Sequence, residues 1–416
     1  MTEQLILITN YYPFHKGEEY LESEIKFLSK EFDQILIIPT MVSNSMQRTR
    51  VVPNNCKVIS YKFSQNKVNR VKTFLKYIPR MLFMDKELIM DASNLNPYKI
   101  VYNLYVQARA LDILDRLVTN KDIIRFMTSN NNTVIYSYWF YLTCMVSIGL
   151  KKEFNKADAK LISRGHGYDV NEHLKPFNYL PFRKYMLANI DYLYTVSNIS
   201  RDNIRNKYPL YKHKIETRRL GALDGEFIEE NNEKLIVSCS TVRTLKRIDV
   251  IIDALKNIDM KKHNLKWIHI GDGPQFEEIK RKAEESLQTS SFKLIGNIPN
   301  SEIKSFYREN KPFLFINTSS SEGVPVSIME ALSYSIPVIA SDVGGTKELL
   351  IDGYNGFLIS QFDDVLEVTN KINDFLNMDI NKYKQMRENA YKSWDKDWNA
   401  EKLYNNFAKE LKKYEK

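Results

Sequence analysis

The sequence predicts an α/β protein with two domains, each built on a doubly wound parallel sheet. Three observations lead to this prediction. The 416 residues are enough for two or three domains with cores of their own. Short β-branched runs alternate with longer segments of helical spacing, which is the pattern of parallel βαβ units. A polar, aperiodic segment at residues 220–234 separates two such series.

In the first half, each expected strand is a short run rich in β-branched or aromatic residues, and the helical segments carry the charge. These strands are Leu5–Thr9, Gln34–Pro39, Thr133–Tyr138, Lys160–Arg164 and Tyr192–Ser197. Residues 134–150 are uncharged and almost long enough to span a membrane, but they contain too many Tyr, Ser and Thr residues for that. We expect a buried strand there that runs into a buried helix.

The second half alternates strand and helix without a break, from LIVSCS at 235–240 to PVIASD at 337–342. Open α/β sheets bind ligands outside the carboxyl ends of their strands, so two such domains predict a shared cleft with two substrates. We place the domain boundaries at residues 1–222 and 223–395. The tail from Tyr383 to Lys416 predicts a helix whose apolar members include Trp394, Trp398 and Phe407.

The net charge of +9 is unevenly distributed. Residues 1–225 hold 33 Lys and Arg against 21 Asp and Glu, whereas residues 226–416 hold 27 against 30. The basic half therefore favours an anionic partner: nucleic acid, phospholipid or a phosphorylated substrate. No recognition helix or zinc-finger pattern supports nucleic acid. The start, MTEQLILITNYYP, lacks the features of a signal peptide, and three isolated cysteines favour a reducing compartment.

The most specific segment runs from Ser319 to Ile359. Glu322 lies in the turn after the strand FLFINTS, and Glu330 lies eight residues later on the helix that Pro325 begins. The start of this helix offers free N–H groups to a diphosphate without a metal. The two carboxylates could accept hydrogen bonds from sugar hydroxyls on either side of that diphosphate.

This segment resembles the ExxxxxxxE region of the family-4 retaining glycosyltransferases of the GT-B fold, and the resemblance extends over nearly the whole chain. It implies that Glu322 contacts the transferred sugar, that Glu330 binds the ribose, and that the backbone of Gly323, Val324 and Pro325 holds the sugar and phosphates. It also implies that residues 396–416 form a helix that returns to the first domain.

Further donor-binding residues follow from the same resemblance. Lys246 in SCSTVRTLKRIDV matches the phosphate-binding Lys of the family, whereas Thr241 stands where the family has Arg, so Arg243 and Arg247 are candidate replacements. A cation there would neutralise charge on the leaving diphosphate. Gly271, in the turn GDGP, and the loop residues Gly296, Asn297 and Ile298 are expected to approach the nucleotide.

In the first half, the resemblance assigns His166 of SRGHGYDV a place facing the donor sugar. It matches Gly17 to the first donor-facing turn, although relatives have more glycines there. No cofactor and no metal are expected: there is no nicotinamide-type GxGxxG, and the only DxD, Asp395 to Asp397, falls in the predicted C-terminal helix.

A basic amphipathic segment at residues 66–83 has apolar residues at alternating spacings of three and four. Its cations are Lys67, Arg70, Lys72, Lys76 and Arg80. This pattern predicts either a helix in the membrane interface or a core-facing helix with a solvated basic face.

The sequence therefore predicts a cytoplasmic, peripheral, metal-independent retaining hexosyltransferase. Its partners would be a UDP- or GDP-linked sugar, a polyprenyl-diphosphate-linked saccharide acceptor and the membrane surface, in cell-surface polysaccharide or capsule biosynthesis. The alternatives are a nucleotide-sugar epimerase or hydrolase on the same fold, and a non-catalytic subunit that binds sugar nucleotides. The sequence leaves the oligomeric state open.

Overall fold

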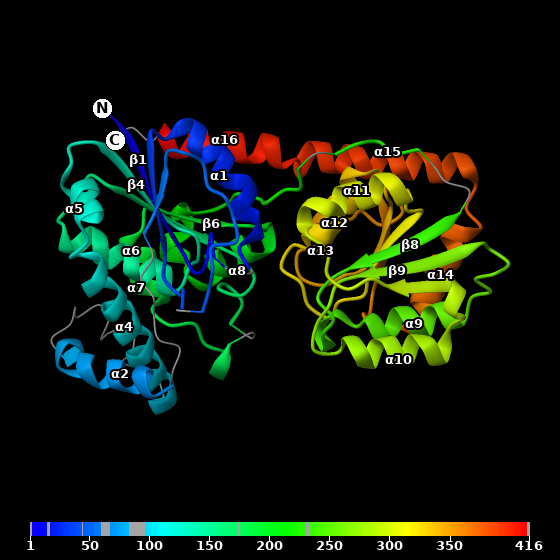
Figure 1. The fold of residues 1–416 in the computed structure, drawn as a ribbon, viewed down its shortest axis with the longest axis horizontal. Helices are drawn as coiled ribbons and strands as arrows, with labels where there is room; N and C mark the ends of the chain where they lie inside the picture. Colours follow the sequence, from blue (N-terminus) through cyan, green and yellow to red (C-terminus); the bar gives the residue numbers. More distant parts are fainter. Residues whose placement is uncertain are drawn as a thin grey trace. The chain divides into compact units, whose positions relative to one another are not determined.

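The computed structural model describes residues 2–14, 17–43, 45–59, 67–82, 96–172, 175–223, 225–229 and 233–413. The chain divides into two compact units, each a parallel sheet with helices packed against it (Figure 1). Unit 1 comprises Met1–Arg219 and Lys402–Lys416, and unit 2 comprises Leu220–Glu401. The predicted fold class, two doubly wound α/β domains, is confirmed.

Unit 1 contains a seven-stranded parallel sheet of order β3-β2-β1-β4-β5-β6-β7. All five strands expected from the sequence are present. Sequence reasoning missed the two edge strands, β3 and β7, because three residues are too few for a periodic pattern. The strands are β1 (Glu3–Thr9), β2 (Gln34–Pro39), β3 (Cys56–Val58), β4 (Asn132–Ser137), β5 (Lys160–Gly165), β6 (Tyr192–Thr195) and β7 (Ile215–Thr217).

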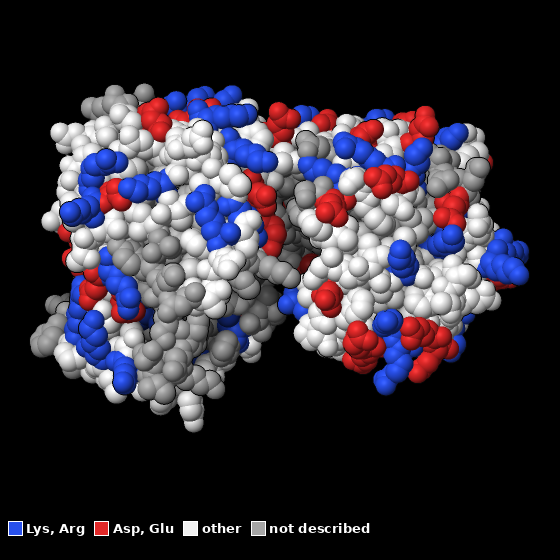
Figure 2. All heavy atoms as spheres, in the orientation of Figure 1, with Lys and Arg blue, Asp and Glu red and all other residues white. Residues whose placement is uncertain are grey.

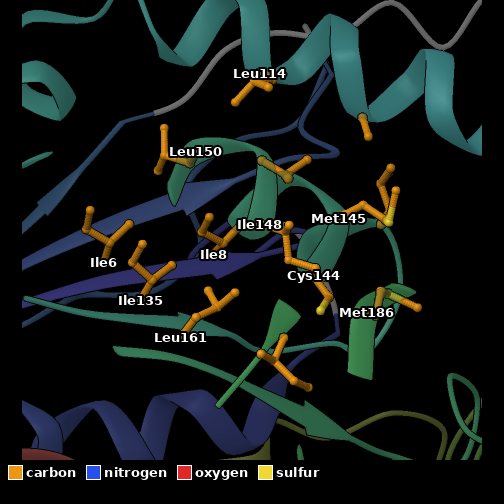
Figure 3. Close-up of a cluster of buried hydrophobic side chains, with 14 of the residues drawn as sticks. Ile6, Ile8, Leu114, Ile135, Cys144, Met145, Ile148, Leu150, Leu161 and Met186 are labelled. Carbon is orange, nitrogen blue, oxygen red and sulfur yellow. The ribbon is translucent and has the colours of Figure 1, made fainter. Parts of the chain in front are cut away.

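The helices of unit 1 cover the sheet and supply most of its core. They are α1 (Glu19–Glu31), α2 (Lys67–Leu82), α4 (Pro97–Leu117), α5 (Lys121–Thr128), α6 (Leu142–Glu153), α7 (Arg183–Asn189), α8 (Asn198–Lys207) and α16 (Ala400–Lys412). The uncharged segment at 134–150 is, as expected, a buried strand running into the buried helix α6. Figure 3 shows Ile6, Ile135 and Leu161 of the sheet in one cluster with Ile148 of α6 and Leu114 of α4.

Unit 2 contains a six-stranded parallel sheet of order β10-β9-β8-β11-β12-β13. Its strands are β8 (Lys234–Cys239), β9 (Leu265–Ile270), β10 (Phe292–Leu294), β11 (Leu314–Asn317), β12 (Val338–Ser341) and β13 (Gly356–Ile359). Its helices are α9 (Ile248–Lys256), α10 (Phe276–Ser286), α11 (Asn300–Asn310), α12 (Val326–Ser333), α13 (Thr346–Leu349), α14 (Val365–Leu376) and α15 (Ile380–Asp397), with the single turn η4 (Thr244–Lys246).

The tail is helical, as expected, and its last residues belong to unit 1, but the helix is interrupted: α15 ends at Asp397, and α16 begins at Ala400. The break has a local cause. Trp398 leaves the helical conformation, its carbonyl accepts the Ala222 N–H at 3.1 Å, and Ala400 N–H donates to the Ala222 carbonyl at 3.1 Å. Hydrogen bonds to residue 222 therefore replace two helical ones. Beyond the break, α16 packs on unit 1, where the rings of Phe407 and Tyr136 lie 5.8 Å apart.

Both sheets reverse their winding at one strand. In unit 1, β1 lies between β2 and β4; in unit 2, β8 lies between β9 and β11. Successive connections leave these neighbouring strands in opposite directions, which opens a crevice at their carboxyl ends. Among the described helices, none is both long and apolar enough to cross a membrane.

Candidate active site

The loops that follow β10, β9 and β8 lie side by side at the carboxyl edge of the unit 2 sheet. Gly271 N–H donates to the Gly296 carbonyl at 2.8 Å, which joins the first two loops. Val242 N–H donates to the Asp272 carbonyl at 3.0 Å, which joins the second and the third. Gly271 has φ +138°, and a Cβ there would lie 1.9 Å from the Ser240 carbonyl oxygen. Only glycine permits this close approach.

The loops after β11 and β12 continue the same edge. Ser320 N–H donates to the Leu245 carbonyl at 2.9 Å, and Gly345 N–H donates to the Gly323 carbonyl at 2.6 Å. Gly345 also has no room for a side chain, since a Cβ would lie 2.4 Å from the Gly323 carbonyl oxygen. Turns that the sequence spreads over about one hundred residues thus form one continuous surface.

Lys246 and Glu322 meet at the crevice of unit 2. The Lys246 Nζ lies 2.6 Å from the Glu322 Oε1, and the Asn317 amide donates to the same oxygen at 3.3 Å. The Lys246 side chain is 15% exposed and that of Glu322 is 10% exposed. This is a short, charge-assisted pair that solvent still reaches. It forms because β8 and β11 are neighbours in the sheet, although the two residues are 76 positions apart.

Glu330 lies on α12, half-buried, in the same electrostatic neighbourhood. Burial raises the pKa of Glu330 to about 7, and the Lys304 ammonium opposes this rise. Burial also raises the pKa of the Cys239 thiol to about 12; the charge of Glu330 adds to that rise, and Lys246 counteracts it. Glu330 and Lys246 are therefore both within electrostatic range of the Cys239 thiol.

The remaining expected donor residues of unit 2 lie in two loops, one before α12 and one after β10. Pro325 caps α12, so Gly323 and Val324 lie in the turn that leads into this helix, as predicted. Gly296 has φ +70° and open space where a Cβ would stand. The next residue, Asn297, accepts a hydrogen bond from Asp272 N–H at 3.1 Å, and Ile298 packs partly on the core.

Arg243 and Arg247 are not brought to the Lys246–Glu322 pair. Both line a cavity of about 520 Å³ next to α10, and neither Lys246 nor Glu322 lines it. The Arg247 guanidinium is bound by the Asp249 carboxylate at 3.0–3.3 Å. In the described residues, Lys246 is therefore the cation that accompanies Glu322, with the Asn317 amide as a neighbour that sequence reasoning missed. Its signal was a polar side chain at the end of an apolar strand.

His166 of unit 1 follows β5 and is buried. Its backbone N–H donates to the Asp169 carboxylate at 2.6 Å, which also accepts the Phe140 N–H at 2.6 Å. The imidazole lies between the rings of Tyr138 and Trp139, with centroids 4.7 and 4.5 Å away. Both ring nitrogens are buried without a hydrogen-bond partner in the structure. Most buried polar atoms have a hydrogen-bond partner in the protein or an ordered water, so these two nitrogens are exceptions.

Gly17, the other expected donor residue of unit 1, belongs to the turn after β1 and has φ +103°. Its N–H donates to the Glu19 carboxylate at 2.7 Å, and its carbonyl accepts a hydrogen bond from Arg50 at 2.7 Å. Asp395 of the DxD lies at the end of α15 and accepts the Asn399 amide at 3.0 Å. Within the described part of the chain, no group of three His, Cys, Asp or Glu could hold a metal ion.

Comparisons with known proteins agree with this arrangement of loops. The family model "Glycosyl transferases group 1" matches residues 224–393, which include the whole edge from β8 to β13. Residues 224–393 are therefore similar to the domain of group 1 glycosyltransferases. An uncharacterized glycosyltransferase of Methanocaldococcus jannaschii is 28% identical to this chain over 299 residues, which cover 70% of this chain and 79% of that protein.

Two further similarities extend the comparison beyond the group 1 domain. The amylovoran biosynthesis glycosyltransferase AmsK of Erwinia amylovora is 23% identical over 51% of this chain, and the match spans about half, 54%, of its length. The structure of Anabaena HepE in complex with UDP and glucose superposes with a TM-score of 0.65 and 14% identity, covering 99% of this chain and all of that one. The chain therefore has the GT-B fold of glycosyltransferases.

The raised pKa of Glu330 predicts a pH-dependent stability. Because the folded-state pKa lies above the value of an unfolded Glu, this residue's contribution is fully present below about pH 4.5 and is lost as pH rises through about 7. We expect Glu330→Gln to gain about 1–3 kcal/mol of unfolding free energy relative to the native chain between pH 5 and pH 8. Urea unfolding of the native chain and of Glu330→Gln at pH 5 and pH 8 measures this difference in unfolding free energy. An equal difference at both would contradict the prediction.

Proposed function

We propose that the chain is a retaining, metal-independent hexosyltransferase that uses a nucleoside-diphosphate sugar. The observation that carries the proposal is the Lys246–Glu322 pair at the crevice of unit 2, beside the start of α12. A donor diphosphate at the helix start would meet free N–H groups and the Lys246 ammonium. Glu322 would then face the sugar joined to that diphosphate. The complex of Anabaena HepE with UDP and glucose supports a donor of this class.

In the proposed reaction, an acceptor hydroxyl attacks the anomeric carbon from the face that the diphosphate leaves. The carbon–oxygen bond to the diphosphate breaks with its electron pair, and the departing oxygen takes the acceptor's proton. Lys246 stabilises the negative charge on the diphosphate, and Glu322 stabilises the positive charge on the sugar. His166 is assigned to the donor sugar and Glu330 to the ribose on the strength of the family resemblance.

A donor screen tests this proposal. Thermal shifts with UDP- and GDP-linked sugars identify the donor, because a ligand that binds only the native state raises its apparent stability. Nucleoside diphosphate release is then measured with and without a lipid-linked saccharide. We expect acceptor-dependent release that survives EDTA and that Glu330→Ala reduces. Release without acceptor would indicate a hydrolase or epimerase, and binding without turnover would indicate a non-catalytic subunit.

We also propose that the acceptor is a saccharide on polyprenyl diphosphate and that α2 holds the protein at an anionic membrane. Val71 and Leu75 on α2 are each 57% exposed, and Val101 on the neighbouring α4 is 58% exposed. The opposite side of α2 packs on α4 through Tyr77 and Met81. Exposed apolar side chains beside exposed lysines are the features of an interfacial helix. Figure 2 shows blue Lys and Arg side chains near α2 and α4.

The cations of α2 differ in their partners. The side chains of Lys72, Lys76 and Arg80 are all exposed. Lys76 Nζ lies 3.2 Å from the Tyr77 hydroxyl, whereas Arg80 is bound to the carboxylates of Asp115 at 2.5 Å and Glu153 at 2.9 Å. The side chains of Lys67 and Arg70 lie outside the described residues. Arg80 is therefore occupied in holding α2 to the rest of unit 1, and the lysines are the cations that lipid can reach.

This division predicts unequal effects on membrane binding. We expect Lys72→Gln and Lys76→Gln each to weaken sedimentation with phosphatidylglycerol vesicles by about 1 kcal/mol. Arg80→Gln is the matched control and should weaken it less. Donor binding should be the same in all three variants. Equal sedimentation of the native chain and the double lysine variant would contradict membrane binding by α2 and would indicate a helix with a solvated basic face.

A further inference from the structure

In the turn after β1 of unit 1, the backbone N–H groups donate to the carboxylate of Glu18. Glu18 is 6% exposed. Its Oε1 accepts the Asn10 N–H at 2.8 Å and the Trp139 indole N–H at 2.6 Å. Its Oε2 accepts the N–H groups of Tyr11 at 2.8 Å and Tyr12 at 2.6 Å. Two donors on each oxygen make this a fully bonded buried carboxylate.

This turn lies at the crevice of unit 1, where β1 and β4 are neighbours. Three successive backbone N–H groups at such a place form an anion-binding nest. Here the nest is filled by Glu18, so these three N–H groups are already bonded within the chain. Glu18 has the left-handed φ of 57°, directly before α1 begins, which turns its side chain back toward residues 10–12.

The fourth donor connects the carboxylate to His166. Trp139 follows β4, and its indole N–H is held by Glu18. The same indole ring lies 4.5 Å from the imidazole of His166, and Tyr138 lies 4.7 Å from that imidazole. The imidazole nitrogens have no hydrogen-bond partner in the structure, although Nδ1 lies 4.0 Å from the Asp169 carboxylate. The imidazole is thus held by ring packing and by this carboxylate, and the Trp139 ring is held by Glu18.

We propose that Glu18 is a positioning residue for sugar transfer: it fixes Trp139, and through Trp139 it fixes the imidazole of His166. This inference rests on the proposed function for its kinetic consequences, since it assigns His166 to the reacting sugar. A small displacement of a group near the reacting atoms costs about 100-fold in rate. The proposal also means that the donor's phosphates are held by unit 2, because the nest in unit 1 already contains an anion.

The arrangement requires a carboxylate of this length. In Glu18→Gln, one end of the amide is an NH₂ group, which would face two N–H donors and could bond to neither. In Glu18→Asp, the side chain is one methylene shorter and cannot reach all four donors. Both conservative variants should therefore behave like Glu18→Ala. Glu22→Gln is the matched control, since Glu22 lies on the same helix with its side chain 53% exposed.

The test is kinetic, with the donor found in the thermal-shift screen. We expect Glu18→Gln and Glu18→Ala to lower kcat about 10- to 100-fold with less than a threefold change in donor KM. Formate supplied at about 100 mM should restore several-fold activity to Glu18→Ala by refilling the nest, but not to His166→Ala. Native kcat in Glu18→Gln, or a loss in Glu18→Ala that formate leaves unchanged, would overturn the proposal.

A second measurement does not depend on turnover. The ring protons of His166, identified by their absence in His166→Ala, should be shifted by the rings of Tyr138 and Trp139 in the native protein. Glu18→Ala should move them toward unstructured values, and formate should reverse this, while Glu22→Gln should leave them unchanged. If no donor is turned over but these shifts respond as expected, the proposed function fails and the positioning contact stands. Shifts that Glu18→Ala leaves unchanged overturn the contact.

Discussion

We expect Lys246→Ala to lower donor turnover by about 100- to 1,000-fold, which is the usual effect of removing one group that stabilises transition-state charge. The reason is that the neighbouring candidate cations have other partners or are absent from the family's position. Lys246 lies 2.6 Å from Glu322, while Arg247 is bound to Asp249 and Thr241 stands at the family's Arg position. In the described part of unit 2, Lys246 is the cation bound to Glu322, so its removal leaves that carboxylate without this partner.

The control for this variant is Lys280→Ala, because Lys280 is an exposed lysine of α10 in the same unit. Nucleoside diphosphate release by the three proteins, with saturating donor and acceptor, gives the comparison. Lys246→Arg should recover part of the loss, since it keeps the charge but changes its shape. Full activity in Lys246→Ala would mean that another residue, such as Arg243, neutralises the diphosphate.

Glu24→Ala should destabilise the protein by about 3–5 kcal/mol, which is the cost of leaving a buried charge without its partner. The Glu24 and Arg164 side chains are both fully buried in unit 1 and bound to each other. The Tyr136 hydroxyl donates to the same carboxylate at 3.0 Å. Arg164 also lies 4.5 Å from the ring of Phe407 on α16. The ion pair therefore connects α1, β5 and the C-terminal helix.

Chemical unfolding of Glu22→Ala, of a double variant and of its two single changes, Glu24→Leu and Arg164→Met, tests the source of this cost. Glu22→Ala removes an exposed carboxylate from the same helix and should change stability by less than about 0.5 kcal/mol. The double variant Glu24→Leu/Arg164→Met replaces both charges by apolar groups and should be more stable than Glu24→Ala alone. A double variant as unstable as the sum of its single changes would indicate that packing, and not the unpaired charge, dominates.

Local sequence patterns were sufficient for the strands that line the sites. Runs such as LIVSCS and FLFINTS are apolar because strands of a parallel sheet are buried on both faces, so their positions follow from composition alone. The turns after them carried Lys246, Glu322 and Gly271, which the resemblance singled out. Edge strands of three residues and the break at Trp398 gave no such pattern, because long-range hydrogen bonds form them.

The sequence also showed that the charge of the chain is uneven, but it did not show which of the basic residues form ion pairs. Arg80 and Lys76 belong to the same predicted basic stripe. Both are exposed, but in the structure Arg80 is bound to Asp115 and Glu153, whereas Lys76 lies near the Tyr77 hydroxyl. Likewise, Arg243 and Arg247 lie within four residues of Lys246, yet in the structure they line a cavity next to α10 that Lys246 does not line.

The sequence by itself determined the fold class, the two-domain plan and the turns that carry the candidate site. Periodicity and turn chemistry are local properties, and each strand of a parallel sheet expresses them within a few residues. Only the tertiary structure decided the pairs: Lys246 with Glu322, Glu24 with Arg164, and Glu18 with Trp139. These partners are 76 to 140 residues apart. Strand order in the sheets brings them together, and no local pattern records that order.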